Sequence, residues 1–201
     1  MRLVIASNNK NKVREIKEIL GDRFDAVIPM REAGIELDVV EDADSFMGNA
    51  RKKAVEAAAL LPDDAVLADD SGLCVDALGG APGVYSARYA GEGHDDAANR
   101  KKLLEALSDV PFSERNAHFA CAMVLILPDG SEINAYGTVD GRILFGEKGE
   151  NGFGYDSLFL YEPAGKTFAE ISPALKNQVS HRRNALMLML GALNEKTDGR
   201  E

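Results

Sequence analysis

The sequence has only two cysteines, and it has no apolar run as long as a membrane span. Cys74 and Cys121 lie in apolar stretches without the spacing of a metal-binding motif, which predicts reduced core thiols in a cytoplasmic protein. A transmembrane helix needs about 20 consecutive apolar residues, so none is expected. Met1 and Arg2 run directly into an apolar strand, so we expect no signal peptide and no membrane partner.

Positive charge is also scarce. The chain of 201 residues carries 23 lysines and arginines against 33 aspartates and glutamates, which gives a formal net charge of −10. This balance argues against a long polyanion such as duplex DNA, so we expect no nucleic-acid polymer as a partner. It does not exclude a small phosphorylated ligand, because a few basic residues in one pocket suffice, and a metal cation helps an acidic site to hold phosphate.

The hydrophobic pattern predicts an α/β fold. Strands are expected over residues 3–6, 24–28, 65–68, 117–127 and 155–161, with several more within 131–145, and helices over 10–20, 45–61, 94–107 and 173–193. We therefore expect one domain, residues 1–201, with a mixed sheet, flanking helices and a second, mainly β lobe. An active-site cleft between the two lobes completes this prediction.

Two adjacent acids and a hydroxyl, Asp69, Asp70 and Ser71, directly follow the expected strand 65–68. Charge next to a core needs a partner such as a metal, a base or a substrate, and ligands of open α/β sheets bind at the carboxyl ends of strands. An Asp-Ser-Gly turn that caps the strand is the alternative.

An acidic loop, residues 36–44, precedes the second expected helix. Glu41 of this loop could join Asp69 and Asp70 to hold Mg²⁺, which prefers one or two carboxylates together with substrate phosphates. A solvated acidic loop is the alternative.

The segment 7–12, Ser-Asn-Asn-Lys-Asn-Lys, joins the first expected strand to the first expected helix. Backbone N–H groups at a helix N-terminus bind anions, Ser7 and Asn9 add side-chain donors, and Lys12 adds positive charge, so a phosphate tail fits. The segment is not a P-loop, because it lacks Gly-x-x-x-x-Gly-Lys. Helix capping by Ser or Asn explains the same residues equally well.

Two later segments combine residue types that suit a nucleotide. Residues 153–156, Phe-Gly-Tyr-Asp, end a glycine-rich loop, where an exposed ring could stack on a base, although such an aromatic is more often part of a core. Lys176 and residues 180–183, Ser-His-Arg-Arg, begin the last expected helix. They suit phosphate or carbonyl groups, and a solvated basic face is the alternative.

Taken in order, these segments resemble the Ham1 family of inosine triphosphate pyrophosphatases. The similarity covers nearly the whole chain and is densest in residues 68–91, in 152–156, and in Lys176 with Ser-His-Arg at 180–182. Asn8 and Asn11 stand where the first loop of the family usually has glycines. Asparagine tolerates a left-handed backbone better than most residues, so we expect the loop to keep its form.

The resemblance implies that the chain is an enzyme. It would hydrolyse ITP, dITP and XTP to the monophosphate and pyrophosphate, and so remove these noncanonical nucleotides before they enter DNA or RNA. The cofactor would be Mg²⁺, with Mn²⁺ as a substitute, and the resemblance also implies a homodimer. Glu41 and Asp70 would hold the metal, and Asp70 would orient or deprotonate the attacking water.

The resemblance also assigns roles in binding. Lys176 would be catalytic and neutralise charge in the transition state, while His181 and Arg182 would donate to the 6-oxo group of the base. The implied substrate-binding residues are Ser7, Asn8, Asn9, Lys10, Asn11, Lys12, Ser71, Phe153, Gly154, Tyr155, Asp156, Lys176, His181 and Arg182. A phosphohydrolase for sugar or pyrimidine phosphates and a nucleotide-binding regulator without turnover are the other two hypotheses.

Overall fold

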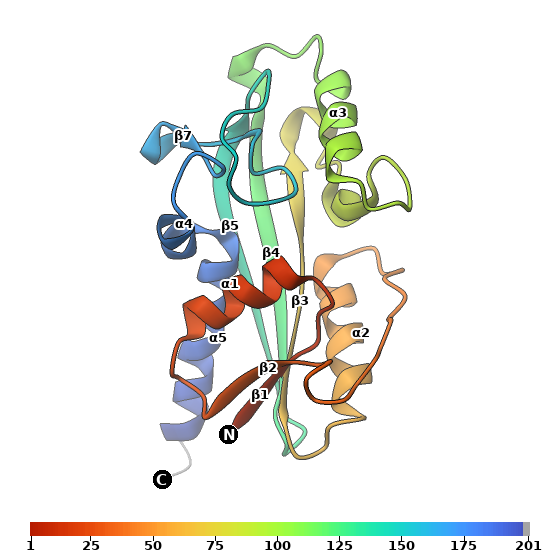
Figure 1. Cartoon of the computed structure of the whole chain (residues 1–201), viewed down its shortest axis with the longest axis vertical. Coiled ribbons are helices and arrows are strands. Elements are labelled where there is room, and N and C mark those ends of the chain that lie inside the picture. Colours follow the sequence, from red (N-terminus) through yellow and green to blue (C-terminus); the bar gives the residue numbers. More distant parts are fainter. Residues whose placement is uncertain (199–201) are drawn as a thin grey trace. The chain divides into compact units, whose positions relative to one another are not determined.

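The chain, described over residues 1–198 in a computed structural model, contains a seven-stranded sheet with the strand order β2-β1-β3-β4-β5-β6-β7 (Figure 1). The strands are β1 (Arg2–Ile5), β2 (Ala26–Pro29), β3 (Ala65–Val75), β4 (Asn116–Ile126), β5 (Glu132–Ile143), β6 (Phe159–Tyr161) and β7 (Lys166–Thr167). β1 pairs in parallel with β2 and β3, whereas β6 pairs antiparallel with β5 and β7. The predicted mixed sheet is confirmed.

The α-helices are α1 (Lys10–Leu20), α2 (Phe46–Ala58), α3 (Asp96–Ala106), α4 (Pro173–Val179) and α5 (His181–Asp198). Short 3₁₀ helices cover Asp76–Leu78, Gly83–Arg88, Phe112–Glu114 and Glu162–Ala164.

The contacts within the chain define two compact units. Unit 1 comprises Met1–Asp70, Cys121–Gly137 and the chain from His181 onward, and unit 2 comprises Ser71–Ala120 and Thr138–Ser180. β3, β4 and β5 each contribute residues to both units. The cleft expected between two lobes stays a prediction.

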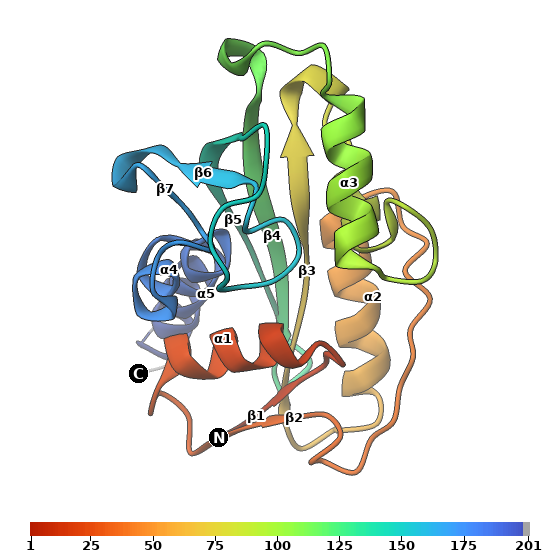
Figure 2. The ribbon, with the colours of Figure 1, turned by 45° about the horizontal axis from the view of Figure 1, so that its top comes forward.

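Successive side chains of the strands in unit 1 point to opposite faces, and apolar residues are buried on both faces, as Leu3 and Val4 of β1 illustrate. Leu3 and Ile5 of β1 pack with Ile16 and Leu20 of α1 and with Leu186 of α5. Within this unit, α1 and α5 lie on one side of the strands and α2 lies on the other (Figures 1 and 2). The buried apolar face of α2 consists of Phe46 and the alanines Ala50, Ala54 and Ala57.

The core of unit 2 is built around aromatic rings. The ring of Phe159 lies 4.6 Å from that of Phe119 and 5.0 Å from that of Phe168, measured between centroids. Tyr155 and Leu158 belong to the same buried cluster. This core supports the glycine-rich loop that precedes Tyr155.

β3 extends further than the sequence predicts. We expected the strand to end at Ala68, but it continues through Asp69 and Asp70 to Val75, so the interpretation as an Asp-Ser-Gly turn is wrong. Buried apolar side chains resume further along, and they keep the segment extended. The parallel register of β1 with β3 ends at Leu67, so the two aspartates begin where that pairing ends.

Three other boundaries also differ. Residues 131–145 hold one long strand, β5, rather than several. β6 begins only at Phe159, because the Asp156 carboxylate accepts a hydrogen bond from the Phe153 N–H at 2.9 Å and keeps the preceding residues turned. The last helix divides at Ser180, whose extended backbone ends α4 before α5 begins. Serine favours such boundaries, since its hydroxyl competes for backbone hydrogen bonds.

Candidate functional site

Asp69 and Asp70 are neighbours on β3, and consecutive side chains of a strand point to opposite faces of a sheet. Asp69 therefore contacts residues of α1 and α5, whereas Asp70 contacts residues of α2. Both carboxylates are buried, with exposures of 1% and 5%. The pleat thus builds two groups in unit 1, which we call the Asp69 cluster (Lys12, Glu15, Asp69 and Arg182) and the Asp70 cluster (Glu41, Asn49, Lys53 and Asp70).

The Asp69 cluster is a network of buried ion pairs. Lys12 Nζ lies 3.2 Å and Arg182 Nη2 lies 3.4 Å from Asp69 Oδ2, and Arg182 Nη1 also pairs with Glu15. Burial alone would raise the pKa of Asp69, but Lys12 and Arg182 outweigh it and hold that pKa well below its usual range. The carboxylates likewise raise the pKa of Lys12 and of Arg182 against the effect of burial. The two cations are therefore held charged beside one carboxylate.

The Asp70 cluster links β3 to α2 and to the acidic loop. Asn49 and Lys53 lie four residues apart on α2, which puts them on one face of the helix. Asn49 Nδ2 donates to Asp70 Oδ2 at 3.1 Å, and Lys53 Nζ lies 3.8 Å from Asp70 Oδ1 and 3.0 Å from Glu41 Oε1. Burial raises the pKa of Asp70, and Lys53 offsets this only in part. A positioned carboxylate with a raised pKa suits the role of a general base.

Glu41 and Asp70 are the two carboxylates of the Asp70 cluster that could hold a divalent cation. The Lys53 ammonium contacts both Glu41 and Asp70, so one positive charge already bridges these two carboxylates. In residues 1–198, no group of three or more His, Cys, Asp and Glu residues could hold a metal ion by itself. Two carboxylates completed by substrate phosphate oxygens are a usual Mg²⁺ environment. Glu41 and Asp70 would hold this cation.

The loop before α1 uses part of its polar groups internally. The Asn9 side chain caps the helix, because its oxygen accepts hydrogen bonds from the N–H groups of Asn11 and Lys12 at 3.0 and 3.2 Å. Ser7 Oγ accepts from the Asn9 N–H, and Asn8 Nδ2 donates to the Leu37 carbonyl. Helix capping, one of the two interpretations left open, is therefore present. Phosphate binding by this loop, and by Lys10 and Asn11 in the first turn of α1, stays a prediction.

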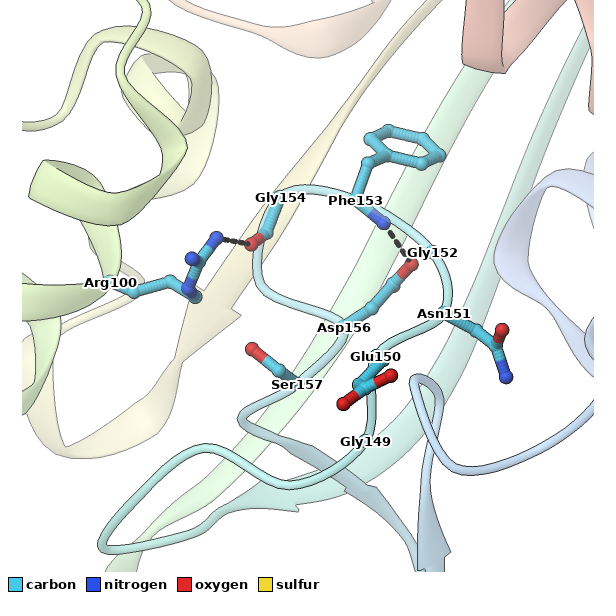
Figure 3. Close-up of a pocket in the computed structure, with 9 residues that line it drawn as sticks. All are labelled: Arg100, Gly149, Glu150, Asn151, Gly152, Phe153, Gly154, Asp156 and Ser157. Atoms are coloured by element: carbon cyan, nitrogen blue, oxygen red, sulfur yellow. Dashed lines mark hydrogen bonds between the residues drawn. The ribbon is translucent and has the colours of Figure 1, made fainter.

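A second group of predicted residues gathers in unit 2, in the glycine-rich loop drawn in Figure 3. Two partners from α3 hold Gly154: its N–H donates to Asp96 at 2.8 Å, and its carbonyl accepts from Arg100 at 2.9 Å. The loop lines a cavity of about 140 Å³, which is too small for a whole nucleotide. In the close-up the Phe153 ring points away from the loop, while the Asp156 carboxylate points back toward the Phe153 N–H.

Lys176 of α4 belongs to the same group. Its buried ammonium lies 2.6 Å from Asp156 Oδ2 and 4.7 Å from the centroid of the Phe153 ring. We call Phe153, Asp156 and Lys176 the loop cluster. The catalytic role of Lys176 at the phosphates stays a prediction, and within unit 2 it contacts Asp156 and Phe153. Within unit 1, Arg182 contacts Asp69 and Glu15.

Three further predicted residues are placed as follows. Ser71 directly follows Asp70 on β3 and is half-buried. Tyr155 is buried in the core of unit 2, and its hydroxyl donates to the Ser86 carbonyl at 2.8 Å, so this side chain supports the loop. His181 is buried at the first position of α5.

The sequence reasoning missed the roles of Glu15, Asn49 and Lys53. Glu15 and Lys53 resemble ordinary charged positions of amphipathic helices; the burial of Glu15 and the contacts of Lys53 with Glu41 and Asp70 distinguish them. Spacing gives a partial signal, since Glu15 follows Lys12 by one helical turn, and Asn49 precedes Lys53 by one turn.

The fold and these clusters define an α/β protein in which buried carboxylates contact lysines and an arginine. The profile of the Ham1 family matches residues 3–192, and the chain belongs to the Ham1 family. It is 49% identical over 186 residues to the dITP/XTP pyrophosphatase of Clostridium tetani, with 92% of each chain covered. It is 48% identical over 188 residues to that of Leuconostoc mesenteroides, with 92% and 93% covered.

Solved structures agree with this assignment. The Ham1 protein of Staphylococcus aureus is similar with a TM-score of 0.85 and 44% identity, over 98% of this chain and 100% of that one. A nucleoside-triphosphatase and dITP/XTP pyrophosphatase of Mycobacterium abscessus is similar with a TM-score of 0.75 and 40% identity, over 94% and 99%. In residues 1–198, no helix is long and apolar enough to cross a membrane.

Proposed function

We propose that this chain hydrolyses dITP, XTP and ITP to the nucleoside monophosphate and pyrophosphate, with Mg²⁺ or Mn²⁺ as its cofactor. The observation that carries the proposal is the Asp70 carboxylate. It is buried, its pKa is raised, and it shares Lys53 with Glu41 in a chain of the Ham1 family. The relatives named dITP/XTP pyrophosphatase give the substrate class. The reaction would remove noncanonical purine nucleotides before a polymerase uses them.

The triphosphate is assigned to unit 1. Lys12 and the loop 7–11 would bind its oxygens, with Ser71 near by. A cation held by Glu41 and Asp70 would polarise the phosphate groups when bound. Asp70 would accept the proton of the water that attacks phosphorus, and Asn49 would keep that carboxylate oriented through its hydrogen bond.

The base is assigned to the loop cluster. Phe153 offers a ring for stacking. The next residue, Gly154, is held by hydrogen bonds at both its N–H and its carbonyl group. Lys176 contacts Phe153 and Asp156, so we assign it to the base rather than to the phosphates. His181 and Arg182 remain the proposed donors to the 6-oxo group, which adenine replaces with an amine.

The test is the product pattern over a panel of nucleotides. Purified protein with Mg²⁺ is incubated with dITP, XTP, ITP, ATP, GTP and dCTP, and the products are separated by ion-exchange chromatography. We expect monophosphate and pyrophosphate in equal amounts from the first three substrates, and little turnover of the others. Orthophosphate release, a preference for pyrimidine or sugar phosphates, or binding without turnover would favour one of the other hypotheses.

We also propose that the chain acts as a cytoplasmic homodimer without nucleic-acid polymers as partners. Sedimentation equilibrium tests the assembly, because a dimer has twice the chain mass of 21.6 kDa. A single species at the mass of one chain would contradict this part of the proposal.

A further inference from the structure

We infer that Asp69 is a positioning residue that holds Lys12 and Arg182 in place, and that it does not bind the metal. Both cations approach the same oxygen, Asp69 Oδ2, at 3.2 and 3.4 Å, and Cys121 Sγ lies 4.0 Å from it. The other oxygen, Oδ1, is buried and has no hydrogen-bond partner among residues 1–198. Asp69 therefore uses Oδ2 to bind two side chains of the protein, Lys12 and Arg182.

Electrostatics separate Asp69 from its neighbour Asp70. A metal ion at Asp69 would meet the repulsion of two cations that already contact Oδ2, and Oδ1 is closed off from solvent. Asp70 instead contacts the neutral amide of Asn49 at 3.1 Å and the Lys53 ammonium at 3.8 Å. The two carboxylates divide their tasks accordingly: Asp69 fixes cationic side chains, and Asp70 is the one suited to a metal.

Asp69 lies where it can fix the positions of α1 and α5 relative to β3. Lys12 comes from α1, Arg182 from α5 and Asp69 from β3, so one carboxylate joins three elements of unit 1. The charges of the cluster balance, because Lys12 and Arg182 face Asp69 and Glu15. Removing one buried partner leaves a charge uncompensated, and a displacement of about 1 Å at a positioned group can lower a rate about 10²-fold.

The first test is a double-mutant cycle with Asp69→Asn and Lys12→Met, measured on kcat/KM for dITP, and this arm rests on the proposed function. Each single variant is expected to lose about 10²-fold. The double variant is expected to lose about the same, because Asp69 acts through Lys12 and its effect is already absent once Lys12 is gone. A loss of about 10⁴-fold in the double variant would mean independent effects and would overturn the inference.

The second test needs no substrate. Asp69→Asn leaves one excess positive charge in the cluster, and adding Lys12→Met restores the balance between Arg182 and Glu15. The double variant should therefore unfold at a higher urea concentration than Asp69→Asn, or fold where Asp69→Asn does not. A double variant no more stable than Asp69→Asn would contradict the inference. Because this arm is independent of turnover, failure of the inference is distinguishable from failure of the proposed function.

The third test concerns the metal. Mn²⁺ binding, followed by electron paramagnetic resonance, should be unchanged in Asp69→Asn and at least about tenfold weaker in Asp70→Asn. Equal weakening in both variants would make Asp69 a metal ligand.

Asp64→Asn is the matched control for all three tests. Asp64 is also a buried aspartate of unit 1, and it pairs with Arg2 outside both clusters. This variant should lower stability while it leaves kcat/KM and Mn²⁺ binding unchanged.

Discussion

At the scale of single residues, the pleat of β3 decides the chemistry of the site. Asp69 and Asp70 are adjacent in the chain, but Asp69 contacts Lys12 and Arg182, whereas Asp70 contacts Asn49 and Lys53. The consequence is visible in their acidity: the pKa of Asp69 is lowered and that of Asp70 is raised. Only the carboxylate with the raised pKa is well matched to accept a proton from water.

A first prediction concerns Phe153. Its ring points away from the loop, and stacking on a base does not depend on the groups at the ring edge. Phe153→Ala should therefore raise KM about tenfold for dITP and by a similar factor for ATP, since stacking contributes about 1–3 kcal/mol per base. Steady-state kinetics with both nucleotides measure this. A rise in KM confined to one of them would show that Phe153 does not stack.

A second prediction concerns Arg182. As a charged donor to the 6-oxo group, it should contribute about 1.5–3 kcal/mol for dITP and little for ATP. Arg182→Ala should therefore narrow the ratio of the two kcat/KM values, mainly by lowering the value for dITP. Arg183→Ala, at the next position of α5, is the control. Equal losses for both nucleotides would instead assign Arg182, with Lys12, to the phosphates.

The sequence could identify most of these residues but not their grouping. Lys12, Glu41, Asp70, Phe153 and Lys176 stand out as residue types in motifs. The contacts of Lys176 with Phe153, and of Arg182 with Asp69, are long-range side-chain contacts that no local spacing encodes.

At the scale of elements, the position of α5 depends on a close approach to β5. A methyl group added at Gly137 would lie 2.3 Å from the backbone nitrogen of Ala185 and 2.5 Å from the carbonyl oxygen of His181. Only a residue without a Cβ allows the helix backbone this near the strand. The start of α5, which carries His181 and Arg182, is set by this contact.

The third prediction follows from that contact. Gly137→Ala should lower the free energy of unfolding by about 1–3 kcal/mol or more, because neither backbone can yield cheaply. It should also lower kcat/KM, since α5 must shift. Gly191→Ala on the same helix is the control: a methyl group there meets nothing within 4 Å, so stability should rise by about 0.5–1 kcal/mol. Urea unfolding of both variants is the measurement, and equal stability would contradict the account of α5.

Elements with strong periodicity were predictable from the sequence. The bounds of α1 match the expected helix 10–20, because its apolar residues recur at helical spacing between a capping Asn9 and Gly21. The extension of β3 and the division of the last helix at Ser180 were not predictable. Both depend on tertiary surroundings, namely the burial of apolar side chains of β3 beyond the aspartates and the packing of α5 on β5.

At the scale of the whole molecule, a negatively charged protein is expected to bind a negatively charged substrate. The formal net charge is −10, so attraction must come from local groups such as Lys12 and Lys53, and from the cation that we propose at Glu41 and Asp70. Each of the two units has its own buried apolar core.

The fourth prediction is that the metal is needed for turnover and not for the stability of the fold. Excess EDTA should abolish turnover, and Mg²⁺ or Mn²⁺ should restore it, whereas the unfolding temperature without substrate should not change. Zinc should not be required, because the donors are carboxylates and not a His/Cys set. Full activity in EDTA, or a large loss of stability, would contradict the assignment of Glu41 and Asp70.

We propose Asp70 as the general base of a dITP and XTP pyrophosphatase. The most direct test of this proposal is pyrophosphate release from dITP by wild type and Asp70→Asn at saturating Mg²⁺. The substitution keeps the size of the side chain and removes its charge, so the protein should stay folded and its rate should fall about 10²-fold or more. A folded Asp70→Asn variant that keeps more than about a tenth of the wild-type rate would contradict the account.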